Sequence, residues 1–125
     1  MIVGIGVDIT TRSRIEGVHR RFKARFAKRF LHSEEMNRYV ELEDAGAFLA
    51  KRFAAKEAAV KALGTGEREG VLLKDFYIHH DERGKPILQV TGEAAKRCDQ
   101  LGITQMHISL SDEGDQVVAF VVLEK

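Results

Sequence analysis

The chain has 125 residues, of which 44% are hydrophobic and 31% are charged, and its formal net charge at pH 7 is +1. This composition excludes a disordered or fibrous protein and predicts one globular domain over residues 1–125. The single cysteine, Cys98, excludes an internal disulfide and a cysteine-based zinc site, so we expect a reducing, cytoplasmic location. The apolar run 1–9 is short and contains Asp8, so we expect neither a signal peptide nor a membrane span.

The charge is unevenly distributed along the chain. Residues 12–29 hold eight basic residues and one acidic residue, a net charge of +7, whereas the other residues hold 12 basic and 18 acidic ones, a net charge of −6. This polarity favours an acidic partner. A nucleic-acid-binding module is the alternative, because Phe22, Phe26 and Phe30 alternate with the basic residues. Their spacing of four, however, is more typical of a helical stripe that faces a core, so we expect no nucleic acid.

Signals at the start of the chain predict a strand followed by helices. Residues 2–9 are rich in Ile and Val, which favours a strand. Ser13 and Glu16 have the spacing of a capping box, which predicts a helix through the basic segment, and Gly17 could break that helix. Ser33 is followed by two acidic residues and predicts a second, short helix.

The remainder of the chain alternates between helix and strand signals. An alanine-rich pattern predicts a long helix over residues 45–63, with Gly64 as its C-terminal cap. The elements expected after it are a hairpin of strands 76–79 and 87–90, a helix from Gly92, and two strands at 106–110 and 117–123.

The long helix has no clean solvent face. At about 100° per residue, its large apolar side chains share one side with Lys56 in their midst. Those apolar residues are Leu49, Phe53, Val60 and Leu63. Since buried charges require partners, we expect Lys56 and the other charged residues of this helix to contact other backbone, another subunit or a ligand.

Asp8 and Glu57 are the carboxylates with the clearest chemical potential. Asp8 ends an apolar strand, where a carboxylate either caps the next helix or holds a ligand. Glu57 precedes Lys61 by four residues, a spacing that by itself favours an intrahelical ion pair. Together, Asp8 and Glu57 could instead provide two hard oxygen ligands for Mg²⁺, with Lys61 facing the charge of a phosphate.

Two further features allow two interpretations each. Gly64, Thr65 and Gly66 could present backbone amides to an anion, although a helix cap and a turn explain them equally well. His107 lies in a predicted strand, where a hydrogen-bonded structural histidine is as plausible as one that contacts a ligand.

Four motifs, in order along the chain, resemble those of the holo-acyl-carrier-protein synthases, a bacterial type of 4'-phosphopantetheinyl transferase. The motif from Arg52 to Gly66, RFAAKEAAVKALGTG, is highly specific, and the resemblance covers essentially the whole chain. The other motifs are Gly4-Ile5-Gly6-Val7-Asp8-Ile9, Gly84-Lys85-Pro86 and His107-Ile108-Ser109-Leu110-Ser111.

The resemblance implies transfer of phosphopantetheine from coenzyme A to a serine of acyl carrier protein, with release of adenosine 3',5'-bisphosphate, in support of fatty acid biosynthesis. Asp8 and Glu57 are then expected to bind Mg²⁺ and, with Lys61, to act catalytically. The serine proton passes either to Glu57 or to a metal-bound water. The remaining residues expected to contact coenzyme A are Arg52, Phe53, Lys61, Gly64, Thr65, Gly66, Gly84, Lys85, Pro86 and His107.

The same resemblance implies an architecture and a partner surface. The expected fold is α+β, with a long central helix on a small antiparallel sheet, and the expected assembly is a homotrimer with active sites between subunits. Arg14, Arg21 and Arg25 are expected to contact acyl carrier protein. Asp112 stands where many similar proteins carry histidine, and we assign it no catalytic role.

Overall fold

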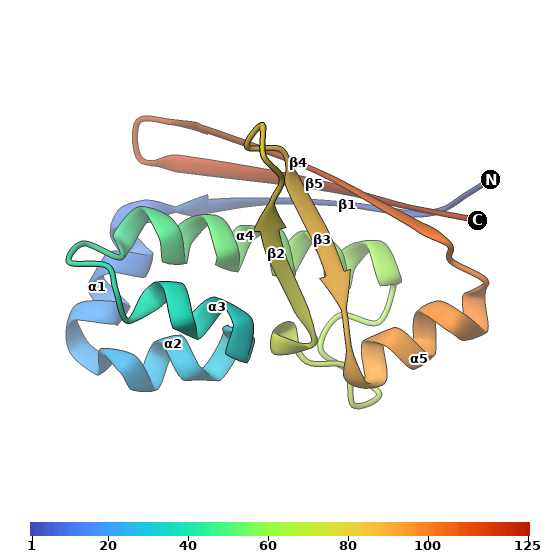
Figure 1. The fold of residues 1–125 in the computed structure, drawn as a ribbon, viewed down its shortest axis with the longest axis horizontal. Coiled ribbons are helices and arrows are strands. Elements are labelled where there is room, and N and C mark those ends of the chain that lie inside the picture. The colour runs from blue at the N-terminus through green and yellow to red at the C-terminus, as the bar shows by residue number, and fades with distance from the viewer.

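A computed structural model describes residues 1–125 and shows an α+β fold in which one long helix runs along one face of a small antiparallel sheet (Figure 1). The elements in chain order are β1 (Ile2–Thr11), α1 (Arg12–Phe22), α2 (Ala24–Phe30), α3 (Ser33–Tyr39), α4 (Gly46–Leu63), the 3-10 helix η1 (Leu73–Asp75), β2 (Phe76–His80), β3 (Pro86–Val90), α5 (Gly92–Leu101), β4 (Gln105–Glu113) and β5 (Gln116–Glu124). No helix is both long enough and apolar enough to cross a membrane.

The three long strands form an antiparallel sheet in the order β1-β5-β4, so β1 and β4 are its two edges. Helix α4 packs directly against this sheet. A Cβ atom on Gly4 would lie 1.9 Å from the carbonyl oxygen of Ala62, and one on Gly6 would lie 2.0 Å from that of Ala58. Only glycine permits so close an approach of strand and helix. The glycines of the first motif therefore set the distance between β1 and α4.

The two faces of the sheet differ sharply. The inward residues of β5 are at most 3% exposed; they are Val117, Ala119, Val121 and Leu123. All helices lie on this side of the sheet in Figure 1. Ile5, Val7 and Ile9, which point to the opposite face of β1, are 52–64% exposed. The sheet thus leaves an uncovered apolar face.

The hairpin of β2 and β3 crosses α4 between the group α1–α3 at one end and α5 at the other (Figure 1). The structure confirms the predicted long helix and its cap, because Gly64 adopts the left-handed conformation with φ of 85°. It also confirms the predicted hairpin and the helix that begins at Gly92.

The start of the first helix differs from the sequence-based expectation. Helix α1 begins at Arg12, and its N-cap residue makes no side-chain cap hydrogen bond. Ser13 instead donates its hydroxyl to Asp115, at 2.5 Å, and Glu16 pairs with Arg12. The predicted capping box is therefore wrong, because Asp115 in the distant β4–β5 turn takes the place of the local partner.

The break in the basic segment is also elsewhere than predicted. The chain turns at Lys23, which has a φ of 51°, whereas Gly17 lies inside α1. The three phenylalanines therefore divide between two helices: Phe22 ends α1 and is 40% exposed, while Phe30 at the end of α2 is 2% exposed. They form no single stripe, and with Phe30 buried they provide no platform for nucleobases.

Strands β4 and β5 extend beyond their predicted bounds. The expected turn at 112–115 shrinks to Gly114 and Asp115, and Gly114 has the positive φ that a tight turn requires. Asp112 and Glu113 consequently lie in β4, paired with Val117 and Gln116. Their polarity indicated a loop because the sequence alone does not show that this strand is an exposed edge.

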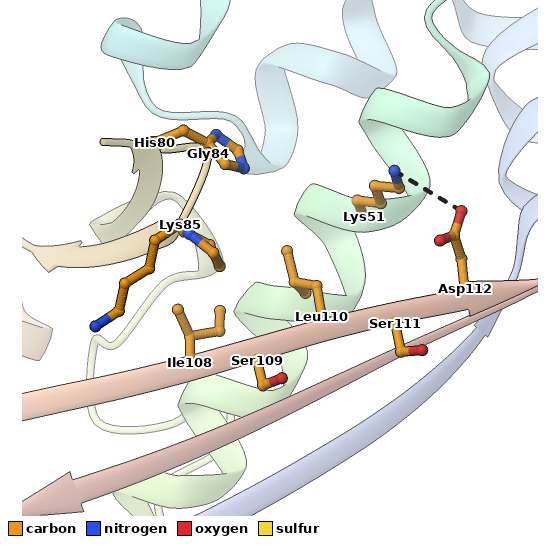
Figure 2. Close-up of a pocket in the computed structure, with 10 residues that line it drawn as sticks. Lys51, His80, Gly84, Lys85, Ile108, Ser109, Leu110, Ser111 and Asp112 are labelled. Carbon is orange, nitrogen blue, oxygen red and sulfur yellow. Dashed lines mark ion pairs between the residues drawn. The ribbon is translucent and has the colours of Figure 1, made fainter. Parts of the chain in front are cut away.

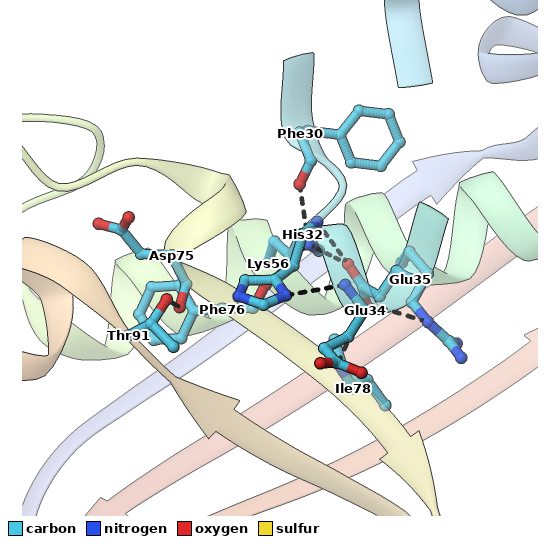
Figure 3. A network of polar contacts seen from close by, with 10 residues as sticks. Phe30, His32, Glu34, Glu35, Lys56, Asp75, Phe76, Ile78 and Thr91 are labelled. Atoms are coloured by element: carbon cyan, nitrogen blue, oxygen red, sulfur yellow. Dashed lines mark hydrogen bonds and ion pairs between the residues drawn. The ribbon is translucent and has the colours of Figure 1, made fainter. Parts of the chain in front are cut away.

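Lys56 finds its partners inside the core, where its side chain is fully buried (Figure 3). Its ammonium donates to the carbonyl oxygens of Phe30 and Phe76, at 2.8 and 2.7 Å, and to Glu35. Glu35 also accepts from the amide of Ile78, at 3.1 Å. This network joins α2, α3 and β2 to α4 and meets the expectation that the lysine requires a partner.

Candidate active site

Asp8, Lys61 and Glu57 gather beside β1, one edge of the sheet. The Lys61 ammonium donates to the carbonyl oxygen of Val7 at 2.9 Å and to Asp8 Oδ1 at 3.2 Å. Asp8 Oδ2 accepts from the hydroxyl of Thr10 at 2.6 Å, which leaves the carboxylate oriented and only 14% exposed. Lys61 forms no ion pair with Glu57, so the intrahelical pair that the spacing favoured is absent.

Glu57 lies where its carboxylate lacks a close positive partner. Its pKa is raised above the ordinary value, first by partial burial and then by the negative charges of Asp8 and Glu67. Lys61 and Arg14 act in the opposite direction without cancelling these effects. Two carboxylates that share one space and repel each other form an environment that favours a cation.

The turn after α4 uses its amides to close the helix. The amide of Gly64 donates to the carbonyl oxygens of Val60 and Lys61, and that of Gly66 donates to Val60 at 3.3 Å. Thr65 is nearly buried, and its hydroxyl donates to the carbonyl oxygen of Gly66. The turn therefore acts as a helix cap in this conformation, because the amides of Gly64 and Gly66 are already hydrogen-bonded to carbonyl oxygens of α4.

A cavity of about 680 Å³ opens beside Glu57 and is partly apolar. Phe53 forms one wall, and its ring packs edge-on against Phe30 at a centroid distance of 5.4 Å. Lys28, Arg29 and Lys74 are also among its lining residues. Glu57 and Glu67 are the carboxylates of this cavity, so it combines an apolar wall with charged groups of both signs.

A second cavity, of about 370 Å³, lies between the tip of the β2–β3 hairpin and the C-terminal half of β4 (Figure 2). Gly84, Lys85 and Pro86 line it from the hairpin. Lys51 and Asp112 approach each other at its opposite side, with 3.7 Å between Nζ and Oδ2. This cavity is predominantly polar and contains both signs of charge.

Arg52 lies near the second cavity rather than beside Glu57. It is 8% exposed, its Nε is 3.2 Å from Glu35 Oε2, and its guanidinium stacks over the ring of Phe48. On an ideal helix Arg52 and Glu57 point about 140° apart, whereas Glu57 and Lys61 are about 40° apart. The positive charge of Arg52 reaches His80, where it adds to burial in lowering the pKa of the imidazole.

His107 projects from the uncovered face of the sheet. Its Nε2 lies 2.9 Å from Glu124 on the neighbouring strand, and its side chain is 53% exposed. It makes no hydrogen bond to Asp8 and does not line the cavity at the hairpin tip, but it lines a separate cavity with residues of β3, among them Ile87 and Gln89. The structure therefore shows it as an exposed, paired histidine.

One chain does not bring the expected site residues together. Asp8, Glu57 and Lys61 lie by β1, while Gly84, Lys85 and Pro86 lie against β4, the opposite edge of the sheet. Neighbouring strands are about 4.8 Å apart, so β1 and β4 are separated by roughly 10 Å of sheet. The expected residues thus form two half-sites.

The structure adds polar residues that sequence reasoning did not identify as part of a site. Lys51 and His80 line the second cavity, and Glu35 supports Arg52 from inside the core. For Lys51 one indication of a partner was present in the sequence: the long helix has no clean solvent face, so its charged residues were expected to contact other groups. For Glu35 no local signal existed, because its partner Lys56 is 21 residues away.

The basic segment presents an exposed surface. Arg14, Arg21 and Arg25 are all exposed, and Arg21 packs over the ring of Phe22 at 5.1 Å. A cavity of about 590 Å³ lined by both apolar and basic side chains lies along α1 and α2, with Val18, Phe22 and Arg25 among its walls. This surface suits an acidic partner that also offers apolar side chains.

Comparison with known proteins places the chain in a family. The model of the 4'-phosphopantetheinyl transferase superfamily matches residues 4–121, and the chain belongs to this superfamily. Within it, the chain is 50% identical over 123 residues to a holo-[acyl-carrier-protein] synthase of Vibrio vulnificus, with 98% of both chains covered. It is 48% identical over 124 residues to one from Photorhabdus laumondii, covering 99% of this chain and 98% of that protein.

Solved structures agree with the family assignment. A holo-[acyl-carrier-protein] synthase from Neisseria meningitidis superposes with a TM-score of 0.93 at 43% identity and full coverage of both chains. One from Helicobacter pylori in complex with coenzyme A superposes with a TM-score of 0.82 at 32% identity, covering 96% of this chain and 99% of that one. The predicted family and the α+β fold are confirmed, and the nucleic-acid alternative gains no support.

Proposed function

We propose that the chain is a holo-[acyl-carrier-protein] synthase that transfers 4'-phosphopantetheine from coenzyme A to a serine of apo acyl carrier protein, releasing adenosine 3',5'-bisphosphate. The observation that carries the proposal is the near-complete coverage of synthases at about half identity. We extend it to a single domain that supports fatty acid biosynthesis in the cytoplasm, where the lone Cys98 would stay reduced.

Asp8 and Glu57 fit Mg²⁺ as two of its ligands. The chain gathers no group of three or more His, Cys, Asp or Glu side chains that could form a cage of protein ligands. Magnesium is commonly held by one or two carboxylates, while phosphates and waters complete its octahedron. The raised pKa of Glu57 next to Asp8 supports this assignment, because a cation there would relieve their repulsion. When bound, Mg²⁺ would neutralise charge on the diphosphate.

Residues of the chain itself would position and stabilise the reacting groups. The serine oxygen attacks the β-phosphorus of coenzyme A in line, and the bond from that phosphorus to the bridging oxygen breaks, so that adenosine 3',5'-bisphosphate departs. Lys61, held at Asp8 beside Glu57, would donate to the phosphate oxygens and balance their growing charge. Either Glu57 or a nearby water accepts the serine proton.

The two half-sites support a homotrimer with active sites between subunits. If the β1 edge of one subunit lies beside the β4 edge of the next, Asp8 and Glu57 of the first meet Gly84, Lys85 and Pro86 of the second. The uncovered apolar face of the sheet offers the surface that such an assembly would bury. Arg52, Phe53, His107 and the 64–66 turn would then complete the coenzyme site from either side.

Mixed assemblies test the arrangement directly. Asp8→Ala disables the first half-site and Lys85→Ala the second, so Asp8→Ala alone should be inactive and Lys85→Ala alone weakly active. Co-refolded mixtures should regain activity, because some interfaces would combine two intact half-sites. Light scattering reports the mass of the assembly in the same samples. A mixture no more active than its parents would contradict sites shared between subunits.

The function itself is tested by one assay. The protein is mixed with apo acyl carrier protein, coenzyme A and Mg²⁺, and the carrier is weighed by mass spectrometry. We expect the mass to increase by one phosphopantetheine group and the increase to vanish when EDTA replaces Mg²⁺. An unchanged carrier mass in the complete mixture would contradict the proposed function.

A further inference from the structure

Asp112 is the only acidic residue among those that line the cavity at the hairpin tip. It belongs to the exposed end of β4 and points toward Lys51 on α4, as Figure 2 shows. The Nζ and Oδ2 atoms are 3.7 Å apart, too far for a hydrogen bond, and both side chains are partly exposed. The contact is therefore a loose ion pair across one side of the cavity.

The other charged groups around the cavity are basic. They are Lys51 and Lys85. His80 also lines the cavity, but burial and then the charge of Arg52 lower its pKa and favour the neutral imidazole. The hairpin loop holds two carboxylates, Asp81 and Glu82, and neither lines the cavity. Asp81 accepts hydrogen bonds from the amides of Arg83 and Lys85. Without Asp112 every charged side chain that lines the cavity would be a cation, which favours the binding of a phosphate.

We propose that Asp112 acts as a displaceable counter-ion for Lys51 and thereby sets the affinity of this cavity for the phosphorylated nucleotide end of coenzyme A. The inference rests on the proposed function and goes beyond it by assigning Asp112 as a specificity-determining residue. A phosphate that enters the cavity takes over Lys51, and Asp112 moves toward solvent.

The geometry makes this exchange possible. Loose, partly exposed ion pairs are weak, so little is lost when Lys51 changes its partner. A phosphate monoester carries nearly two charges and three acceptor oxygens, and it competes well against a single carboxylate. Asp112 stays close after the exchange, however, and repels the bound phosphate. The competition of Asp112 for Lys51 and its repulsion of the bound phosphate both make binding weaker than in a cavity without this carboxylate.

The competing explanation is a purely structural role, in which the pair ties the start of α4 to the end of β4. That role predicts a loss of thermal stability when Asp112 is changed and no gain in ligand affinity. A binding experiment distinguishes the two explanations, because only the counter-ion role predicts tighter binding when Asp112 is changed.

The decisive variant is Asp112→Asn, with Glu113→Gln as its matched control. Glu113 is the next residue on the same strand, is exposed, makes no ion pair and does not line the cavity, so its substitution changes the net charge identically. Calorimetric titration measures the dissociation constants of coenzyme A, adenosine 3',5'-bisphosphate and uncharged adenosine. We expect Asp112→Asn to tighten the two phosphorylated ligands about two- to fivefold, the scale of one partly exposed charge interaction. Adenosine affinity and the Glu113→Gln control should not change.

A double-mutant cycle with Lys51→Met tests the counter-ion role itself. Lys51→Met should weaken both phosphorylated ligands, and the gain from Asp112→Asn should be clearly smaller in that background. An equal gain with and without Lys51 would show general charge repulsion and overturn the proposal, as would unchanged affinity with a lower melting temperature. If the wild-type protein binds no coenzyme A and modifies no carrier, the proposed function fails; if it does both and the variant matches its control, only this inference fails.

Discussion

Replacing Lys56 by methionine should strongly destabilise the protein, although the volume of the side chain hardly changes. The substitution removes the cation that faces the buried carboxylate of Glu35 and leaves the carbonyl oxygens of Phe30 and Phe76 without their donor. Removing one partner of a buried ion pair costs about 3–5 kcal/mol, chiefly through the charge left behind. Arg52 and the amide of Ile78 still contact Glu35, which favours the lower part of that range.

Urea unfolding monitored by circular dichroism measures this loss. About 3 kcal/mol is a large part of the roughly 5–15 kcal/mol that stabilises a typical domain, so the midpoint should shift markedly. The control is the double variant Glu35→Leu with Lys56→Met, which removes both charges together and should be more stable than the sum of the two single effects predicts. A single-variant loss below about 1 kcal/mol, or strictly additive effects, would refute the reasoning.

The pH dependence of stability gives a second measurement of the same group. Burial lowers the pKa of Lys56 from 10.5 to about 8, partly opposed by Glu35, so the amine remains charged at pH 7. Between pH 8 and pH 10.5, Lys56 is still protonated in the unfolded chain but has lost its proton in the folded chain. The contribution of Lys56 to stability therefore rises from pH 8 to 10.5, by at most about 3 kcal/mol. The difference in unfolding free energy between wild type and Lys56→Met should grow over this window, and a constant difference would contradict the lowered pKa.

Three groups of substitutions, at the proposed metal ligands, at Lys61 and at the proposed partner surface, complete the predictions. Asp8→Ala or Glu57→Gln should abolish Mg²⁺-dependent transfer while the melting temperature changes little; near-normal turnover at limiting Mg²⁺ would contradict the ligand role. Lys61→Ala should weaken coenzyme A binding and slow transfer, which titration and a rate assay measure; an unchanged dissociation constant would reduce Lys61 to a structural partner of Asp8. Reversing Arg14 and Arg21 to glutamate should raise the KM for acyl carrier protein roughly tenfold or more but leave coenzyme A affinity unchanged. The KM of the wild-type enzyme for the carrier should also rise as salt is added. If the reversed variant keeps the wild-type KM at low salt, the carrier docks elsewhere.

Local patterns in the sequence determined a large part of this molecule. The alanine-rich run and Gly64 predicted α4 and its end, and runs rich in β-formers with turn residues between them predicted the strands, because such patterns depend only on neighbouring residues. The motif from Arg52 to Gly66 indicated the family, which the comparisons confirm. Asp8 and Glu57 stood out from their residue types and positions alone, and their role as ligands stays a prediction.

Only the tertiary structure decided which charges meet. Lys61 pairs with Asp8, 53 residues away, instead of with Glu57 one turn away, because the close packing of β1 on α4 brings Asp8 within its reach. Lys56 likewise meets Glu35 across 21 residues. A long-range pair depends on the path of the whole chain, and no local propensity encodes that path.

The same reason explains the division of the expected site residues. The sequence places the Asp8 and Gly84 motifs in order along the chain but does not reveal that β1 and β4 become opposite edges of one sheet. Strand order arises when β5 inserts between them, since its apolar residues fill the core against α4 while both outer strands pair with it. Motifs thus identified the chemistry, and the packing of β5 and α4 decided that one chain presents it as two separate halves.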